Sequence, residues 1–464
     1  MSMSVKLLRE PMALNSNSLL ERCDRYFQIS GRGSSLRTEL LAGLSLYLSL
    51  AYILILNPSI LAQAGFNTNS VLFATAVASG LTTILMGVWA RLPFALAPGL
   101  EMNGFVAFSA ISIMGLSIGQ ALGAVFWSGM LCLLLTWLPI RSKIIAAIPA
   151  SLQSNLAFSV GVFVLTIGLF LSKIVLFTDG APSSLGNIIS PEALCLYLGL
   201  FLCCALRSFN SKKYKQLSLL SASAFLIAII ASAIFARLQG ITVQHPSSIS
   251  IDMLSGIGLL DWFPFTSPEV LTVFIVLFLI DFYGSIGKFI GLTAATNLRS
   301  KENTGVIGME KAMYVDGIGT IGGALIGTTS IITYVESAIG IHAGGRTGIV
   351  AITCGLLMIT SLIFTPLMAL IPVVATSGVL IYVGYALIPK QDLLSGNFSR
   401  FDLTIGILMA LVSFFTFSLD KAMLLGFGAY ALKQILSKNE KPNVFLIGSF
   451  LLLLLSFGIQ SYLK

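Results

Sequence analysis

The sequence predicts an all-α polytopic membrane protein built from two inverted halves of seven transmembrane segments each. The 464-residue chain is 56% hydrophobic and 10% charged, with a mean hydropathy of +0.94. A soluble protein would carry about 25% charged residues. No alternation typical of a β-barrel is visible, so helices are the remaining way to span a membrane. The net charge of +8 needs no nucleic-acid partner, because basic residues gather in cytoplasmic loops.

The first half is predicted to span residues 39–236, after a basic cytoplasmic segment at 1–38. Asn57-Pro58 should kink its first apolar run. Pro98-Gly99 interrupts the third run, which places Glu101 and Asn103 at the start of a half-helix at membrane depth. The apolar runs lie at about 40–62, 70–90, 92–114, 118–140, 150–171, 190–206 and 216–236.

The second half is predicted at 268–437, after an extracytoplasmic loop at 237–267. Its third run is again broken: Gly327 and the polar residues after it precede about three helical turns from Ile331 to Ile341, which contain Glu336. Two halves of an odd number of helices must be inverted relative to each other, and matching broken segments indicate a transport site. The C-terminal segment 438–464 contains one more hydrophobic run, which is interpreted as an extra peripheral helix; the alternative is that one of the other segments is divided wrongly. The apolar runs lie at about 268–292, 310–326, 328–341, 347–370, 373–389, 402–418, 421–437 and 443–461.

The distribution of basic residues favours a cytoplasmic N-terminus. That orientation leaves only Lys173, Arg237 and Lys421 outside, with Lys464 if the last run spans, which agrees with the positive-inside rule. The cytoplasmic side then collects Arg91, Arg141, Lys143, Arg207, Lys212, Lys213, Lys215, Arg299, Lys301, Lys311, Arg346, Lys390, Arg400, Lys433, Lys438 and Lys441.

Five charged residues fall inside the predicted spans, and each is a candidate for function. Glu336 is interpreted as part of a ligand site, with pairing to a neighbouring helix as the alternative. Asp281 and Lys288 share one helix face, two turns apart. For Asp316, helix packing or a pairing with Lys311 is weighed equally with function; the fifth charge is Glu101.

The six cysteines and two histidines show no ligand spacing. We therefore expect no metal site, no cofactor, no disulfide framework and no catalytic residue. A channel or a membrane-embedded enzyme is correspondingly disfavoured.

Four stretches resemble the AzgA-type branch (guanine/hypoxanthine/adenine permeases) of the nucleobase-cation symporter-2, or xanthine/uracil permease, superfamily. They are AYILILNPSIL (51–61), ATAVASGLTTILMGVWARLPFALAPG (74–99), Asp281 with GSIGKFIG (284–291), and GTIGGALIGTTSIITYVESAIGIHAGGRTG (319–348). The resemblance implies core and gate domains, a substrate held between the broken segments, and proton-coupled uptake. It assigns the base to Glu336 and Asn103 and a transport role to Asp281. Thr333 and Val335, which flank Tyr334 in ITYVESAIG, join the candidate substrate-binding residues, as does Glu101, which lies beside Asn103 in the first broken segment.

Three positions depart from the family pattern. Glu101 replaces a glycine, Gly284 replaces a second aspartate, and Lys288 replaces an uncharged residue. We hypothesise that Glu101 and Lys288 pair across the site, because isolated buried charges are costly. The alternative is that Lys288 extends towards the cytoplasm.

These observations predict a secondary active transporter, a proton-coupled symporter of a purine nucleobase. Glu336 could accept two N–H bonds from a purine, and Asp281, in apolar surroundings, could carry the coupling proton. The alternative is the same fold carrying uracil, xanthine or a small anion, because of Glu101 and Lys288. The expected partners are the substrate, protons and membrane lipids. We also expect a homodimer in a plasma or inner membrane.

Overall fold

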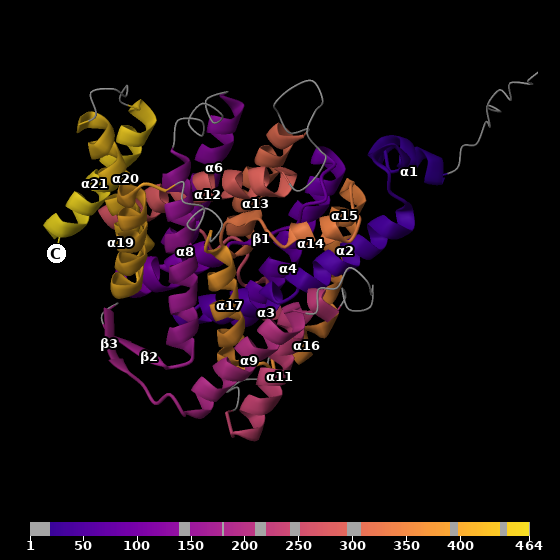
Figure 1. The fold of residues 1–464 in the computed structure, drawn as a ribbon, viewed down its shortest axis with the longest axis horizontal. Coiled ribbons are helices and arrows are strands. Elements are labelled where there is room, and N and C mark those ends of the chain that lie inside the picture. The colour runs from indigo at the N-terminus through magenta and orange to yellow at the C-terminus, as the bar shows by residue number, and fades with distance from the viewer. Residues whose placement is uncertain are drawn as a thin grey trace, which may run out of the picture.

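The structure is a computed structural model that describes residues 19–138, 149–178, 181–208, 220–241, 251–294, 308–389, 398–436 and 443–463. Helices and broken segments occupy the predicted runs (Figure 1). Among the described residues, seven helical stretches are long and apolar enough to cross a membrane, and shorter apolar helices lie between them. Their outer surface is apolar, as at Phe201 and Ile363, which are 68% and 73% exposed. The fold is therefore the predicted polytopic helical fold with seven-plus-seven inverted repeats.

The first half begins after a short amphipathic helix, α1 (Leu19–Phe27). The first run divides into two helices at Ala51–Tyr52, before Pro58. A hairpin of β2 (Val175–Thr178) and β3 (Ala181–Leu185) follows α8. The membrane segments are α2 (Leu36–Leu50), α3 (Ile53–Leu61), α4 (Thr68–Leu85), β1 (Leu96–Pro98), α5 (Leu100–Gly104), α6 (Ile118–Trp137), α8 (Ala150–Leu171), α9 (Pro191–Ser208) and α11 (Ala224–Leu238), with π-helical turns at Met86–Ala90 and Phe105–Ile113.

The second half repeats this order, and its run at 443–461 forms a helix that packs on α20 and α12. Its segments are α12 (Pro268–Ala294), α13 (Met309–Ile326), β4 (Ile331–Thr333), α14 (Ser337–His342), α15 (Gly348–Thr360), α16 (Thr365–Met368), α17 (Ser377–Leu387), α19 (Arg400–Thr416), α20 (Leu419–Leu436) and α21 (Val444–Leu463).

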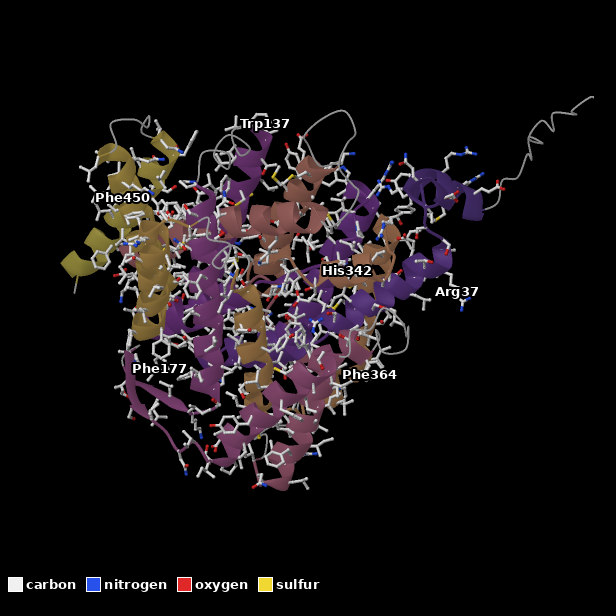
Figure 2. The ribbon with its side chains drawn as sticks, in the orientation of Figure 1. Arg37, Trp137, Phe177, His342, Phe364 and Phe450 are labelled. Atoms are coloured by element: carbon white, nitrogen blue, oxygen red, sulfur yellow. The ribbon has the colours of Figure 1, made fainter. Side chains whose placement is uncertain are left out.

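The membrane helices form two groups, each drawing on both halves of the chain. One group packs α2, α4, α6, α12, α13 and α15 together; the other packs α8, α9, α11, α17, α19 and α20 together. We name them the core group and the gate group. Figure 2 shows Trp137, at the end of α6, and Phe177, in β2, near opposite edges of the molecule.

The two broken segments meet in a two-stranded antiparallel sheet. Leu96 pairs with Thr333 and Pro98 with Ile331. Beyond the strands, Tyr334 N donates to Ala95 O at 3.0 Å. Equivalent segments of the two halves thus run antiparallel, as inverted repeats require.

The prediction of a continuous half-helix from Ile331 to Ile341 is wrong. Gly327, with a φ of +102°, ends α13. The β-branched residues 331–333 are then extended, because β1 offers them a pairing partner. Helix α14 has only six residues, and Glu336 lies immediately before it.

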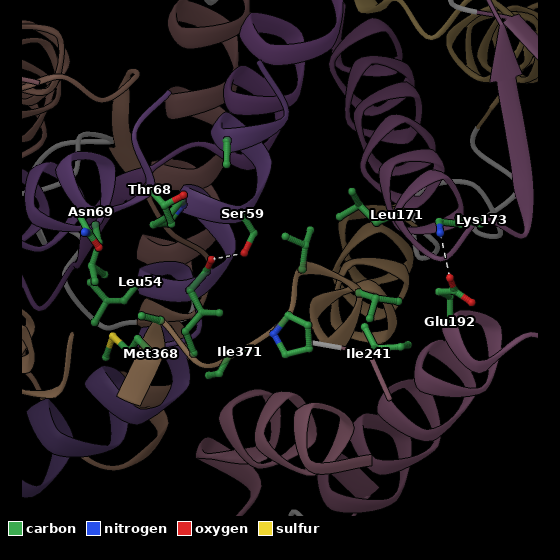
Figure 3. A pocket seen from close by; sticks show the side chains of 18 residues that line it. Leu54, Ser59, Thr68, Asn69, Leu171, Lys173, Glu192, Ile241, Met368 and Ile371 are labelled. Atoms are coloured by element: carbon green, nitrogen blue, oxygen red, sulfur yellow. Dashed lines mark hydrogen bonds and ion pairs between the residues drawn. The ribbon is translucent and has the colours of Figure 1, made fainter. Parts of the chain in front are cut away.

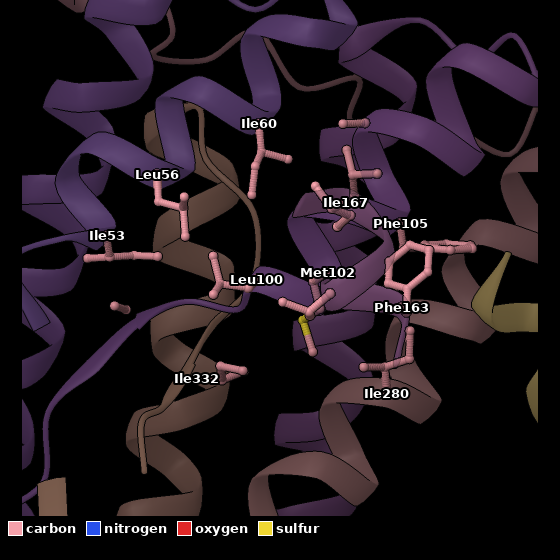
Figure 4. Close-up of a cluster of buried hydrophobic side chains, with 14 of the residues drawn as sticks. Ile53, Leu56, Ile60, Leu100, Met102, Phe105, Phe163, Ile167, Ile280 and Ile332 are labelled. Atoms are coloured by element: carbon pink, nitrogen blue, oxygen red, sulfur yellow. The ribbon is translucent and has the colours of Figure 1, made fainter. Parts of the chain in front are cut away.

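Close packing fixes the first broken segment and the helices of the core group in place. Figure 4 shows Met102 and Phe105 of the first segment beside Phe163 and Ile167 of α8. Where α15 packs on the turn Met86–Ala90, a Cβ on Gly348 would lie 1.9 Å from the Gly87 carbonyl oxygen. This approach is open only to glycine.

Part of the predicted topology falls outside the described residues. This is true of residues 1–18, of 242–250 in the predicted loop, and of the C-terminal link 437–442. The domain boundaries and the cytoplasmic N-terminus stay predictions. The same holds for the basic residues Arg141, Lys143, Lys212, Lys213, Lys215, Arg299, Lys301, Lys390, Lys438, Lys441 and Lys464, which also lie outside the described residues.

Candidate functional site

Glu336 presents a carboxylate at the end of the second broken segment. The residue is 7% exposed. Tyr52, from the break between α2 and α3, donates its hydroxyl to Oε1 at 3.0 Å. Oε2 is buried and has no hydrogen-bond partner among the described residues. Glu336 therefore offers a fixed acceptor, oriented through its other oxygen.

The pocket beside Glu336 lies between the core and gate groups. It has a volume of about 190 Å³. Glu336 and Val335 belong to the second broken segment, which packs on α2 and α13 of the core group, whereas Arg207 of α9 and Phe225 of α11 come from the gate group. Apolar side chains complete the wall: Ile339, Val383, Ala386 and Leu387. Such a pocket can enclose a flat ring and hydrogen-bond to its edge.

A larger pocket of about 410 Å³ adjoins this one, since both share Val335, Ala386 and Leu387 in their walls. It contains the two charges that depart from the family pattern. Lys288 Nζ lies 2.9 Å from Glu101 Oε1, and the two side chains are 15% and 8% exposed. The residues predicted to pair are thus adjacent, and they connect α12 to α5.

Two buried aspartates lie close to the strand of the second broken segment, Asp316 in direct contact with it and Asp281 through Thr320. Asp281 accepts hydrogen bonds from Ser285 at 3.2 Å and from Thr320 at 3.0 Å. Thr320 Oγ1 also lies 3.4 Å from the carbonyl oxygen of Ile331. Asp316 Oδ1 accepts the amide N–H of Thr333 at 3.2 Å. A change in the charge of Asp316 would therefore act on β4 directly. A change at Asp281 would act through the Thr320 hydroxyl, whose single hydrogen can be donated either to Asp281 or to the Ile331 carbonyl.

The remaining predicted residues lie behind the pocket walls. Asn103 and Thr333 are fully buried, and neither lines the two pockets. Thr329 donates to Asn103 Oδ1, which ties the two broken segments together. Val335, by contrast, is 43% exposed and lines both pockets. The structure therefore brings Glu336, Val335, Glu101 and Lys288 to the pockets.

Sequence reasoning did not identify Tyr52, Arg207 or Phe225 as functional residues. Arg207 ends an apolar run and was counted as a cytoplasmic charge. Tyr52 and Phe225 lie in apolar runs and resemble ordinary packing residues. The break before Pro58 was the one available signal for Tyr52, because broken helices mark sites.

A third pocket of about 360 Å³ lies elsewhere between the two groups (Figure 3). It is lined by Leu54 and Ser59 of α3 and by Leu171 of α8. Lys173 and Glu192, also in its wall, form an ion pair at 2.8 Å. The interface between the groups is thus hollowed in more than one place.

Comparison with known proteins connects this geometry to transport. The sequence matches the Permease family, the xanthine/uracil permeases, over residues 37–417. The adenine permease AdeQ of Escherichia coli (strain K12) is 32% identical over 413 residues, covering 89% of this chain and 90% of that protein. The guanine/hypoxanthine permease GhxP of Escherichia coli O157:H7 is 30% identical over 447 residues, covering 94% and 95%.

A solved structure shares the fold. The transmembrane domain of a cyanobacterium bicarbonate transporter, BicA, superposes with a TM-score of 0.62 at 15% identity, covering 84% of this chain and 97% of that chain. The family match extends over most of the sequence and includes both broken segments. The chain therefore belongs to the xanthine/uracil permease family and is an integral membrane transport protein, not an enzyme.

Proposed function

We propose that this protein is a secondary active transporter that carries a purine nucleobase together with protons. The base would bind in the pocket between the core and gate groups, against Glu336. The purine class comes from the named relatives, the adenine permease and the guanine/hypoxanthine permease. Movement of one helix group against the other would then expose the site to each side of the membrane in turn.

The observation that carries this proposal is the buried Oε2 of Glu336. A buried acceptor without a partner is costly, so a ligand that donates to it gains affinity. Purine edges carry N–H donors, and the apolar walls suit the faces of the ring. An analogue without the N–H would leave the acceptor unpaired, which provides selectivity.

We assign the coupling proton to Asp281. The residue is 1% exposed and lies in the apolar helix α12, where a carboxyl group is a candidate proton carrier. The contact through Thr320 to β4 would transmit its protonation to the segment that carries Glu336. Protonation would favour substrate binding, and deprotonation inside the cell would favour release.

A small anion is a weaker candidate substrate. Glu101, Lys288, Glu336 and Arg207 line the two adjoining pockets, and their formal charges sum to zero. Lys288 already lies next to Glu101. The walls therefore offer no excess positive charge for an anion. Uracil and xanthine, which are uncharged bases, fit the pockets better as alternatives to an adenine-type or hypoxanthine-type substrate.

Uptake into proteoliposomes tests the proposal. With an imposed inward proton gradient, the wild type should accumulate radiolabelled hypoxanthine or adenine, and E336Q should not. The matched control is E310Q, at the exposed start of α13. D281N should lose the dependence on the gradient, whereas D252N, at an exposed aspartate, should keep it. Gradient-driven uptake by D281N equal to the wild type would remove Asp281 from this role.

We propose further that the transporter works as a homodimer in a plasma or inner membrane, with its N-terminus in the cytoplasm. The mass of the purified protein in detergent tests the dimer. Protease cleavage near residue 10 in right-side-out and inverted vesicles tests the orientation.

A further inference from the structure

Arg207 faces the same pocket as Glu336 but belongs to the other helix group. It lies in the last turn of α9, and its Nε is buried without a hydrogen-bond partner among the described residues. Glu336 Oε2 has the same status. No described ion pair or hydrogen bond joins the two side chains. One pocket of about 190 Å³ is therefore lined by a donor atom, Arg207 Nε, and an acceptor atom, Glu336 Oε2, of oppositely charged groups, and neither atom has a hydrogen-bond partner among the described residues.

An aromatic cluster holds the guanidinium in place. Arg207 Cζ lies 4.5 Å from the centroid of the Phe225 ring, a cation–π distance. Phe225 is 2% exposed and is contacted edge-on by Tyr52 at 5.0 Å between ring centroids. Tyr52 in turn donates to Glu336. The cluster thus connects both charged groups and limits their movement before a ligand arrives.

We propose that Arg207 is a specificity-determining residue of this site and that it selects 6-oxopurines over 6-aminopurines. The inference rests on the proposed function. A 6-oxopurine presents N1–H, which can donate to a carboxylate, next to O6 and N7, which can accept from the fork of an arginine. At the same edge, adenine places an exocyclic amino group, so that donor would meet donor. The relatives do not decide between these bases, because the adenine and the guanine/hypoxanthine permeases are similarly identical to this chain.

The proposal also explains how substrate could couple the two groups. Glu336 is fixed to the core group, and Arg207 to the gate group. A base that binds both would bridge them, so the site is complete only when the groups are close together. An unoccupied transporter would lack that bridge.

Binding measurements on purified protein test the role of Arg207. R207K keeps the positive charge but removes the planar fork, and R207Q removes the charge. We expect hypoxanthine affinity to fall about tenfold or more in both variants, as for the loss of a bidentate contact to a base. Adenine affinity should change less than about threefold. R400K, at an exposed arginine on the same predicted side of the membrane, is the matched control.

The outcomes separate this inference from the proposed function. Equal losses for both bases, or no loss for hypoxanthine, would overturn the role of Arg207 while nucleobase binding stands. If no nucleobase binds the wild type, the proposed function fails as well. One arm needs no variant: the wild type should bind hypoxanthine at least about tenfold more tightly than unsubstituted purine, which lacks both the O6 acceptor for Arg207 and the N1–H donor for Glu336. Equal affinities there would overturn the inference even if the variants do not fold.

Discussion

Replacing Lys288 with methionine removes one partner of the ion pair between α12 and α5. At 2.9 Å the attraction between the two charges is about 6 kcal/mol for an effective dielectric constant of 20. Most of this is offset by the loss of hydration, which costs several kcal/mol for each ion. The variant K288M loses the attraction but keeps Glu101, only 8% exposed, out of water.

The free energy of unfolding should therefore fall by about 3 kcal/mol in K288M and by a similar amount in E101Q. The double variant E101Q/K288M should lie within about 1 kcal/mol of the wild type, since an uncharged pair of similar size leaves no buried charge. Reversible unfolding in mixed detergent micelles gives the four free energies of the cycle, and the coupling energy follows.

An exposed ion pair on the gate side, between Lys173 and Glu192, provides the control. Lys173 and Glu192 lie 2.8 Å apart, but their side chains are 64% and 23% exposed. The cycle with K173M and E192Q should give a coupling energy below about 1 kcal/mol. Additive losses at Glu101 and Lys288, or a coupling no larger than that of the exposed pair, would refute the reasoning.

Two further predictions concern the broken segments. T320V removes the hydroxyl that lies between Asp281 and β4. The variant should lose about 1 kcal/mol of unfolding free energy, but its proton-driven uptake should fall strongly. Uptake equal to the wild type would argue against a role for Thr320 in connecting Asp281 to β4. G348A should lower the free energy of unfolding by about 3 kcal/mol or more, because the new methyl group would overlap the Gly87 carbonyl oxygen. G322A, where a Cβ meets nothing within 4 Å, should be neutral or slightly stabilising in the same thermal melts.

Segment positions could be predicted because apolar runs and helix breakers are local signals. Pro98-Gly99 and Gly327 marked both broken segments, and the helices lie where the runs do. The extended conformation of Ile331–Thr333 could not be predicted, since it depends on pairing with a strand more than 200 residues away. An apolar β-branched triplet alone is compatible with either helix or strand.

The site could be predicted only in its charged part. Glu336, Glu101 and Lys288 stand out because a charge in an apolar run demands an explanation. Arg207 does not, because arginine is common where a helix leaves the membrane. Its position opposite Glu336 results from the packing of the gate group on the core group.

The most direct test of a nucleobase site at Glu336 is the thermal stability of purified protein with adenine, guanine, hypoxanthine, xanthine, uracil and small anions. A ligand at 100 times its dissociation constant stabilises by about 2.7 kcal/mol. The account predicts that a purine stabilises the wild type and E310Q but not E336Q. Stabilisation by an anion and by no nucleobase, or equal stabilisation of E336Q by the purine, would contradict it.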